Sequence, residues 1–221
     1  MSFGTNLQYL RRLSNMTQET LAEKLQLSRQ TVSKWESDSA QPDIGKAIEL
    51  CKLFSCSLDR LFREDMAVSD ASYSDLCVRT VAAFRYVSYT VISPDPETDA
   101  LERMRALAKR YGDEEPRLIG WDFPKLSVEQ TNVYHLHGYT AAWVLPEDIE
   151  PENEQVFSQP EQRYASIHIK DPFQDPFVLI PGAYRTLMDY MRLNGLEHTE
   201  KNCIPCFETD GADMDVYIAC L

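Results

Sequence analysis

The sequence contains no apolar run near the roughly 18 residues that a membrane-spanning helix needs. Its first residues also lack the basic, apolar and small-residue succession of a secretory signal peptide. We therefore expect a cytoplasmic protein with no membrane partner. No G-x-S-x-G nucleophile motif is present, and Cys203–Cys206 is not accompanied by a second C-x-x-C. These absences predict a protein that is not an enzyme and that uses no cofactor or metal.

The segment Thr17–Glu36 has the pattern of two short amphipathic helices joined by a tight turn. Thr17 and Ser28 are hydroxyl residues at the expected N-caps, and Val32 and Trp35 form the apolar face of the second helix. Its outward side chains are of the kinds that bind base edges and phosphates. They are Ser28, Arg29, Gln30, Ser33 and Lys34. The pattern predicts a helix-turn-helix whose second helix enters the major groove of DNA. The alternative is a small protein-binding bundle in which Arg29 and Lys34 belong to a solvated face.

Residues 5–62 resemble the Cro and phage-repressor type of helix-turn-helix, also called the xenobiotic-response-element family. The resemblance implies an all-α bundle of five helices over residues 1–63. It adds Gln18 to the DNA contacts, and it implies that Arg11 and Glu36 pair to hold the first helix against the reading helix. The chain departs from the family at Gln26, where many members have Gly in the turn. Gln costs about 1 kcal/mol there if φ is positive.

Positive charge is scarce, and its distribution divides the chain. Residues 1–63 hold nine Lys and Arg against seven Asp and Glu, whereas residues 64–221 hold thirteen against twenty-eight. The acidic part would repel DNA phosphates, so we expect it to serve another ligand. The weakly basic N-terminal part predicts modest non-specific affinity, so specific binding to operator DNA would require a homodimer on two half-sites.

A linker is expected over residues 64–83, because residues 64–75 are small, polar and acidic. The stretch 76–84 fits either a connecting helix or the start of a strand. From Tyr86 onward one pattern occurs twice. Each copy has a strand, a Pro-rich turn, a helix that ends before Gly112 or Gly195, and two further strands. The strands are expected at residues 86–92, 119–123 and 133–145 in the first copy, and at 162–169, 204–208 and 214–219 in the second. This order predicts an α+β domain over residues 84–221, built from two β-α-β-β repeats with a crevice between them.

The second domain resembles the gyrase-inhibitor-like, AraC-type effector-binding domains of multidrug-responsive regulators. The likeness rests on RYASIHIKD, AYRTLMDYMRLNGL, CIPCFETD and DVYIACL, taken in order. It implies that Glu208 faces a pocket, since the family has an acidic residue there. Strand alternation predicts that Ile204, Cys206 and Glu208 share one face, with Ile119, Trp121 and Phe123 as its counterpart in the first copy. A carboxylate among aromatic rings suits a hydrophobic, cationic effector. The candidate effector-binding residues are Glu208, Trp121, Phe123, Tyr139, Trp143 and Tyr164.

Three other hypotheses concern the second domain. A cupin-like metal site would use His135 and His137 on one strand face, but the later cupin ligands are absent. A hydrolase of reactive drug-like molecules would use the same crevice, with Glu208 as general base. A redox sensor would use Cys203 and Cys206, although free buried thiols are the favoured interpretation. The sequence as a whole predicts a ligand-responsive transcription regulator with a small-molecule effector.

Overall fold

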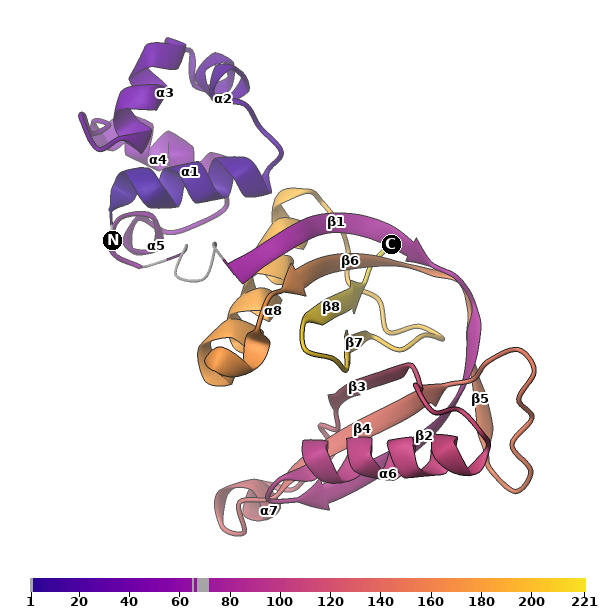
Figure 1. The fold of residues 1–221 in the computed structure, drawn as a ribbon. Coiled ribbons are helices and arrows are strands. Elements are labelled where there is room, and N and C mark those ends of the chain that lie inside the picture. Colours follow the sequence, from indigo (N-terminus) through magenta and orange to yellow (C-terminus); the bar gives the residue numbers. More distant parts are fainter. Residues whose placement is uncertain (1, 65, 67–71) are drawn as a thin grey trace. The chain divides into compact units, whose positions relative to one another are not determined.

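The computed structural model describes residues 2–64, 66 and 72–221, and the chain forms two compact units (Figure 1). Residues 1–71 and 184–196 make up the first unit, which we call the head. Residues 72–183 and 197–221 make up the second, which we call the sheet unit. The helix α8 (Pro176–Leu193) starts in the sheet unit and ends in the head. The boundary that we expected near residue 63 therefore does not account for residues 184–196.

The part of the head before residue 65 consists of five helices. Each begins after a Ser, Thr or Asp whose side chain accepts a hydrogen bond from a backbone N–H of the first turn, which satisfies a donor that has no partner inside the helix. The helices are α1 (Phe3–Leu13), α2 (Gln18–Leu25), α3 (Arg29–Glu36), α4 (Ile44–Leu53) and α5 (Leu58–Arg63). Their apolar faces meet in a core that includes Leu7, Leu10, Leu21, Val32, Leu50, Phe54 and Leu61.

The turn between α2 and α3 is strained at Gln26. This residue ends α2 in the left-handed region, with φ 55° and ψ 46°. A side chain costs free energy there because its Cβ crowds the backbone, whereas Gly adopts the conformation freely. The positive φ that the resemblance to the repressor family raised at this position is confirmed.

Replacing Gln26 by Gly is expected to raise the unfolding free energy of the head by about 0.5–1 kcal/mol. Urea denaturation followed by Trp35 fluorescence would measure it. Glu23→Gly is the matched control, because Glu23 is an exposed residue inside α2, where Gly should cost about 1 kcal/mol. A loss of stability in both variants would show that the turn is not strained.

The sheet unit contains one antiparallel sheet of eight strands within the described residues. Their order across the sheet is β1-β6-β8-β7-β3-β4-β2-β5. The strands are β1 (Tyr73–Val81), β2 (Phe84–Ser93), β3 (Leu118–Asp122), β4 (His137–Val144), β5 (Val156–Gln159), β6 (Gln162–Ile169), β7 (Cys206–Thr209) and β8 (Met214–Ala219). The predicted linker over residues 64–83 is wrong for residues 73–81, because these residues form strand β1, which pairs with β6. Residues 65 and 67–71 of that linker lie outside the described residues.

The order β2–α6–β3–β4 recurs along the chain as β6–α8–β7–β8, with α6 spanning Pro96–Arg110. The two sets of strands meet at the centre of the sheet, where β3 pairs with β7. The first copy departs from the predicted pattern before β4. A short helix α7 (Val128–Asn132) begins with a capping box at Ser127, and His135 has φ 50°. The predicted strand over residues 133–145 is therefore wrong for residues 133–136.

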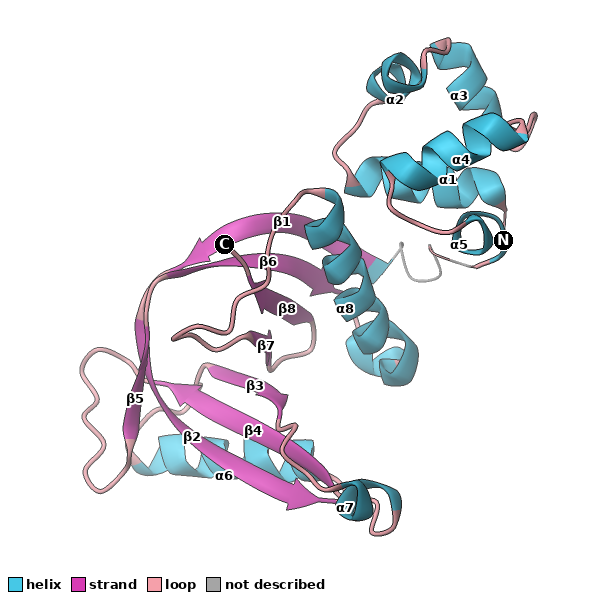
Figure 2. Ribbon diagram, turned by 180° about the vertical axis from the view of Figure 1, so that it is seen from behind, coloured by secondary structure: helices cyan, strands magenta, loops and turns pink. Residues whose placement is uncertain are grey.

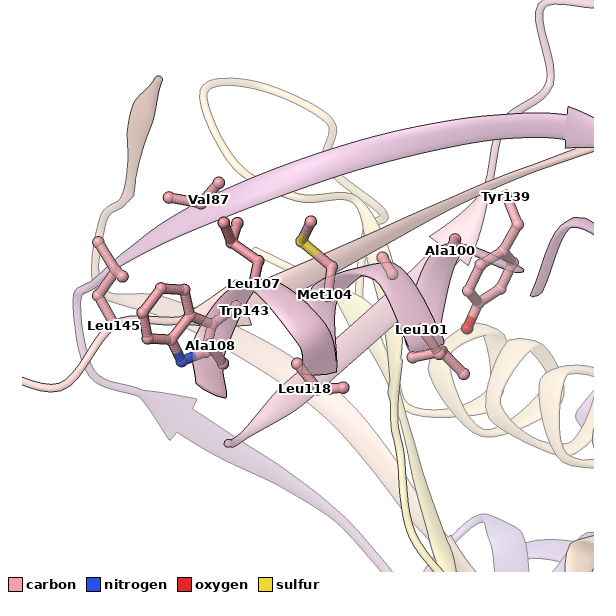
Figure 3. Packing of buried hydrophobic residues seen from close by; sticks show 11 residues of the cluster. Val87, Ala100, Leu101, Met104, Leu107, Ala108, Leu118, Tyr139, Trp143 and Leu145 are labelled. Atoms are coloured by element: carbon pink, nitrogen blue, oxygen red, sulfur yellow. The ribbon is translucent and has the colours of Figure 1, made fainter. Parts of the chain in front are cut away.

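Helix α6 covers one face of the sheet over β2, β3 and β4 (Figure 2). Its apolar residues Leu101, Met104 and Leu107 pack with Leu118 and Trp143 of the strands (Figure 3). We call this the α6 face. The opposite face carries a second buried cluster that includes Ile119, Tyr164, Ile204, Phe207 and Tyr217.

Candidate nucleic-acid interface and effector site

Helix α3 has one buried side and one exposed side. Val32 and Trp35 are buried in the head, as the periodicity predicts. The polar residues of α3 and its N-cap that are expected to bind DNA are all exposed, whereas Gln18 of α2 is half-buried. The exposed residues are Ser28, Arg29, Gln30, Ser33 and Lys34. Ser28 is also the N-cap, since its hydroxyl accepts from the Thr31 N–H at 3.1 Å. A rigid helix therefore presents a row of hydrogen-bonding and cationic side chains.

The predicted pair of Arg11 and Glu36 is confirmed. Arg11 Nε lies 2.5 Å from Glu36 Oε1, and Nη2 lies 3.0 Å from Oε2. Both side chains are largely buried, at 11% and 3% exposure, so this bidentate pair fixes α1 to the end of α3. Gln18 donates from Nε2 to the same Oε2 at 2.9 Å. The structure thus gives Gln18 a role in holding α3, in addition to the DNA contact that the resemblance implies.

Arg29 already has an acidic partner in the head. Its Nε lies 2.9 Å from Glu19 Oε1, and both side chains are more than half exposed. An exposed ion pair of this kind contributes only about 0–1 kcal/mol, because solvent screens it. The guanidinium can therefore exchange Glu19 for a base edge or a phosphate at little cost.

The end of α8 is held in the head by an ion-pair network that sequence analysis did not find. Arg60 donates from Nη1 and Nη2 to Asp189 at 3.0 and 2.5 Å. Arg192 donates to the same carboxylate at 3.2 Å and to the backbone carbonyls of Phe54 and Ser55 at 2.6 and 2.8 Å. Asp189 is buried, so these two guanidinium groups offset the cost of removing its carboxylate from water.

Uncharged contacts extend this network along the same segment. The hydroxyls of Tyr9 and Thr186 lie 3.1 Å apart, and both residues are buried. Asn194 donates to the Leu13 carbonyl at 2.8 Å and accepts from Asn15 at 3.2 Å. Residues 184–196 thus form an integral part of the head, and no signal within residues 1–63 alone could reveal it.

Glu208 lies on the α6 face at the centre of the sheet. It is on β7, opposite Gly120 of β3 and Val216 of β8. The Tyr139 hydroxyl lies next to Gly120, where any Cβ would overlap with it, so the glycine creates the room for this phenol. Tyr139 donates to Glu208 Oε1 at 3.4 Å, whereas Oε2 has no hydrogen-bond partner among the described residues. The glutamate is 8% exposed.

Two further acidic side chains surround Glu208. Glu97 comes from the first turn of α6, and Asp122 lies on β3, two residues from Gly120 and therefore on the same face. Burial first, and then the charges of Glu97 and Asp122, raise the pKa of Glu208 to about 8, while the hydrogen bond from Tyr139 acts in the opposite direction. Burial first and then Asp122 also raise the pKa of Glu97. The site is therefore an acidic cluster around one buried carboxyl group.

The raised pKa makes the stability of the ligand-free protein depend on pH. An unfolded glutamate ionises near pH 4.5, but folded Glu208 keeps its proton up to about pH 8. The folded state therefore binds more protons between these values, and stability falls as pH rises, by at most about 1.4 kcal/mol per unit. Glu208→Gln should match the wild type at pH 5 and exceed its thermal midpoint at pH 8. Equal midpoints at both pH values would mean that Glu208 is ionised when folded.

The structure does not gather all of the predicted aromatic residues around Glu208. Tyr139 touches it. Trp143 is on the same face but lies in the core, where its Nε1 donates to Asp113 at 2.8 Å. Trp121 and Tyr164 belong to the opposite face, with Ile119 and Ile204. Phe123 follows the end of β3, half-buried and close to Gly138.

The sequence predicts the wrong sheet face for Trp121 because the face depends on the register between the strands of the two repeats. The sequence predicts Trp121 on the same face as Glu208. In the structure, the residue of β3 that pairs with Glu208 of β7 is Gly120, so the neighbouring Trp121 points to the opposite face. Ile204 precedes β7 and packs on the far face, so it does not share a strand face with Glu208. Alternation within one strand is visible in sequence, whereas the register between distant strands is not.

The alternative metal and thiol sites gain no structural support. His135 precedes β4 with a positive φ, so it does not share a strand face with His137. Over residues 2–64, 66 and 72–221, no group of His, Cys, Asp or Glu side chains could hold a metal ion. The six cysteines are free thiols, and Cys203 lies outside β7. Within the same residues, no helix is long and apolar enough to span a bilayer.

The head has the geometry of a helix-turn-helix, and comparisons with known proteins agree. The helix-turn-helix family model matches residues 7–61. An uncharacterised HTH-type transcriptional regulator of Methanocaldococcus jannaschii is 39% identical over 56 residues, which are 25% of this chain and 85% of that protein. The chain belongs to the helix-turn-helix transcriptional regulators.

Other relatives match this regulator over part of their length or at low identity. The HTH-type transcriptional activator BcrR of Enterococcus faecalis is 44% identical over 61 residues, which are 28% of the regulator and only 30% of BcrR. The cryo-EM structure of an EcmrR–DNA complex is similar over 93% of the regulator and 84% of that chain, with 13% identity and a TM-score of 0.47.

Proposed function

We propose that the regulator binds operator DNA through α3 as a homodimer in the cytoplasm, and that an apolar cation bound at Glu208 modulates this binding. The DNA part rests on α3, whose polar side chains are exposed while Val32 and Trp35 fix its orientation. Arg can bind guanine bidentately, Gln can bind adenine, and Ser or Lys can bind phosphate. The head carries little excess positive charge, so two copies on two half-sites supply the affinity.

The effector part rests on one observation: Glu208 Oε2 is buried and has no hydrogen-bond partner among the described residues. A buried polar atom without a partner costs about 1–3 kcal/mol, so an ionised carboxylate there favours a ligand that brings positive charge. Tyr139 supplies an aromatic ring beside it.

Binding fits the site better than turnover does. The one thiol on the same strand, Cys206, has a pKa raised to about 11, first by burial and then by Asp122 and Glu208. It is therefore protonated at neutral pH and is a poor nucleophile.

Helix α8 gives the proposed regulation a physical route. Its first part, Pro176–Ala183, belongs to the sheet unit, and its remainder is held in the head by Asp189. A ligand that favours one conformation of the sheet unit would act on the head through this continuous helix. The ligand can change operator affinity by no more than the ratio of its own affinities for the DNA-binding conformation and for the alternative conformation.

Tetraphenylphosphonium is a suitable probe for the effector site, because its charge is permanent and tetraphenylborate has the same shape with the opposite charge. At pH 9, calorimetry should show that the protein binds the phosphonium and not the borate. Glu208→Gln should weaken phosphonium binding by about tenfold or more, since a charge-assisted contact is lost. Undiminished binding in this variant would remove Glu208 from the site. Equal binding of both ions would reject charge recognition altogether.

The operator can be found by selection from random DNA with the purified full chain. The enriched sequences should contain two inverted half-sites about one helical turn apart, as a dimer of such heads requires. Failure to enrich any sequence above a non-specific control would contradict the DNA-binding part of the proposal.

A further inference from the structure

The three carboxyl groups at the α6 face have no salt-bridge partner among the described residues, and the positive charge of His137 only partly offsets the rise that burial causes in the pKa of Asp122. No salt bridge involves Glu97, Asp122 or Glu208 in the described part of the chain. Arg105, which is on the same helix as Glu97, is paired with Asp210 at 2.5 Å. Clustered carboxyl groups usually share a cation or keep a proton, because their mutual repulsion opposes full ionisation.

Glu208 is the member that keeps a proton most readily, because it is the most deeply buried. The groups that face it come from five elements. Glu97 on α6 and Asp122 on β3 carry negative charge, Tyr139 on β4 donates a weak hydrogen bond, and Cys206 on β7 is an uncharged thiol. Val216 on β8 completes the surroundings with an apolar side chain. Repulsion from two carboxylates and the cost of burial thus both oppose a bare Glu208 anion.

We propose that Glu97, Asp122 and Glu208 bind the positive charge of the effector together, and that Glu208 releases its proton when the cation binds. This inference rests on the proposed function, since it assumes that the effector is a cation bound at this site. The exchange is balanced: the O–H bond of the Glu208 carboxyl breaks, the proton passes to solvent, and the carboxylate pairs with the ligand. The net charge of the buried site changes little, so the exchange avoids creating an isolated buried ion.

The exchange predicts how affinity varies with pH. With a Glu208 pKa of about 8, the carboxyl is mostly protonated at pH 7, and the cation must displace that proton. Affinity should therefore fall about tenfold for each unit below pH 7 and change little above pH 9. Glu97 and Asp122 attract the cation and, through their repulsion, set the pH at which the exchange occurs.

Calorimetric titration of the full chain with tetraphenylphosphonium tests the proposal directly. The probe does not titrate, so any proton released comes from the protein. Measurements at pH 7 in buffers of different ionisation enthalpy should give about 0.9 protons released per ligand. Glu208→Gln should release almost none. Binding without proton release in the wild type would overturn the proposal, whereas the absence of binding at any pH would instead reject the proposed cationic effector.

The variant Glu97→Gln tests whether Glu97 takes part in the proton exchange at Glu208 or has only a structural role. Removing this neighbouring negative charge should lower the pH midpoint of proton release and weaken binding at pH 9 by severalfold. Glu102→Gln is the matched control, because Glu102 is an exposed carboxylate on the same helix. An unchanged midpoint in Glu97→Gln, or an equal shift in Glu102→Gln, would contradict the assignment of Glu97 to the site.

Discussion

The triple variant Arg29→Ala, Gln30→Ala and Lys34→Ala is expected to weaken operator binding by at least about 100-fold. Each side chain that contacts a base or phosphate contributes about 1–3 kcal/mol, and none of the three is buried in the head. The loss of two cations should also reduce the slope of log affinity against log salt concentration by about 2. Fluorescence anisotropy with the selected operator measures both quantities, and urea denaturation checks that the fold is intact.

The control for this variant removes two positive charges elsewhere on the head. Lys52 and Arg63 are exposed and belong to α4 and α5, not to α3. Their joint replacement by Ala should lower affinity only through the general electrostatic attraction and leave sequence preference unchanged. If the two variants lost the same affinity and the same preference, α3 would not be the reading helix.

Asp189→Ala is expected to destabilise the head by about 2–4 kcal/mol. Arg60 and Arg192 converge on this buried carboxylate, so its removal leaves two partly buried guanidinium groups without their anion. Urea denaturation followed by Trp35 fluorescence would report the loss. Asp59→Ala is the control, because Asp59 pairs with Arg63 where both side chains are more than three-quarters exposed. That exposed pair should contribute less than about 1 kcal/mol. If Asp189→Ala lowered the unfolding free energy no more than Asp59→Ala does, residues 184–196 would add no stability to the head through this network.

The helix-turn-helix could be predicted closely because its signals are local. Thr17 and Ser28 mark helix starts by their own side-chain chemistry, and the periodic spacing of Val32 and Trp35 needs no distant partner. The sequence also predicts β6 and β8 at the residues where they occur, since their alternating and bounded patterns are local. The pair of Arg11 and Glu36 came from the family resemblance and not from spacing.

The features that sequence analysis missed depend on contacts between distant residues. Arg60 and Asp189 are 129 positions apart, and neither has a neighbour that marks it as part of a pair. Strand β1 is rich in polar residues and resembles a linker until β6 lies beside it. Trp121 was assigned to the wrong face because a shift of one residue in the pairing of β3 with β7 reverses every side chain.

Thermodynamic linkage between DNA and effector tests most directly whether a cation bound at Glu208 controls the head. Operator affinity of the full chain would be measured by anisotropy at pH 9 with and without saturating tetraphenylphosphonium, and phosphonium affinity with and without operator. Each ligand should change the affinity of the other by the same factor, about fivefold or more, and Glu208→Gln should abolish this coupling. Operator affinity that stays constant while phosphonium saturates the protein would contradict this coupling.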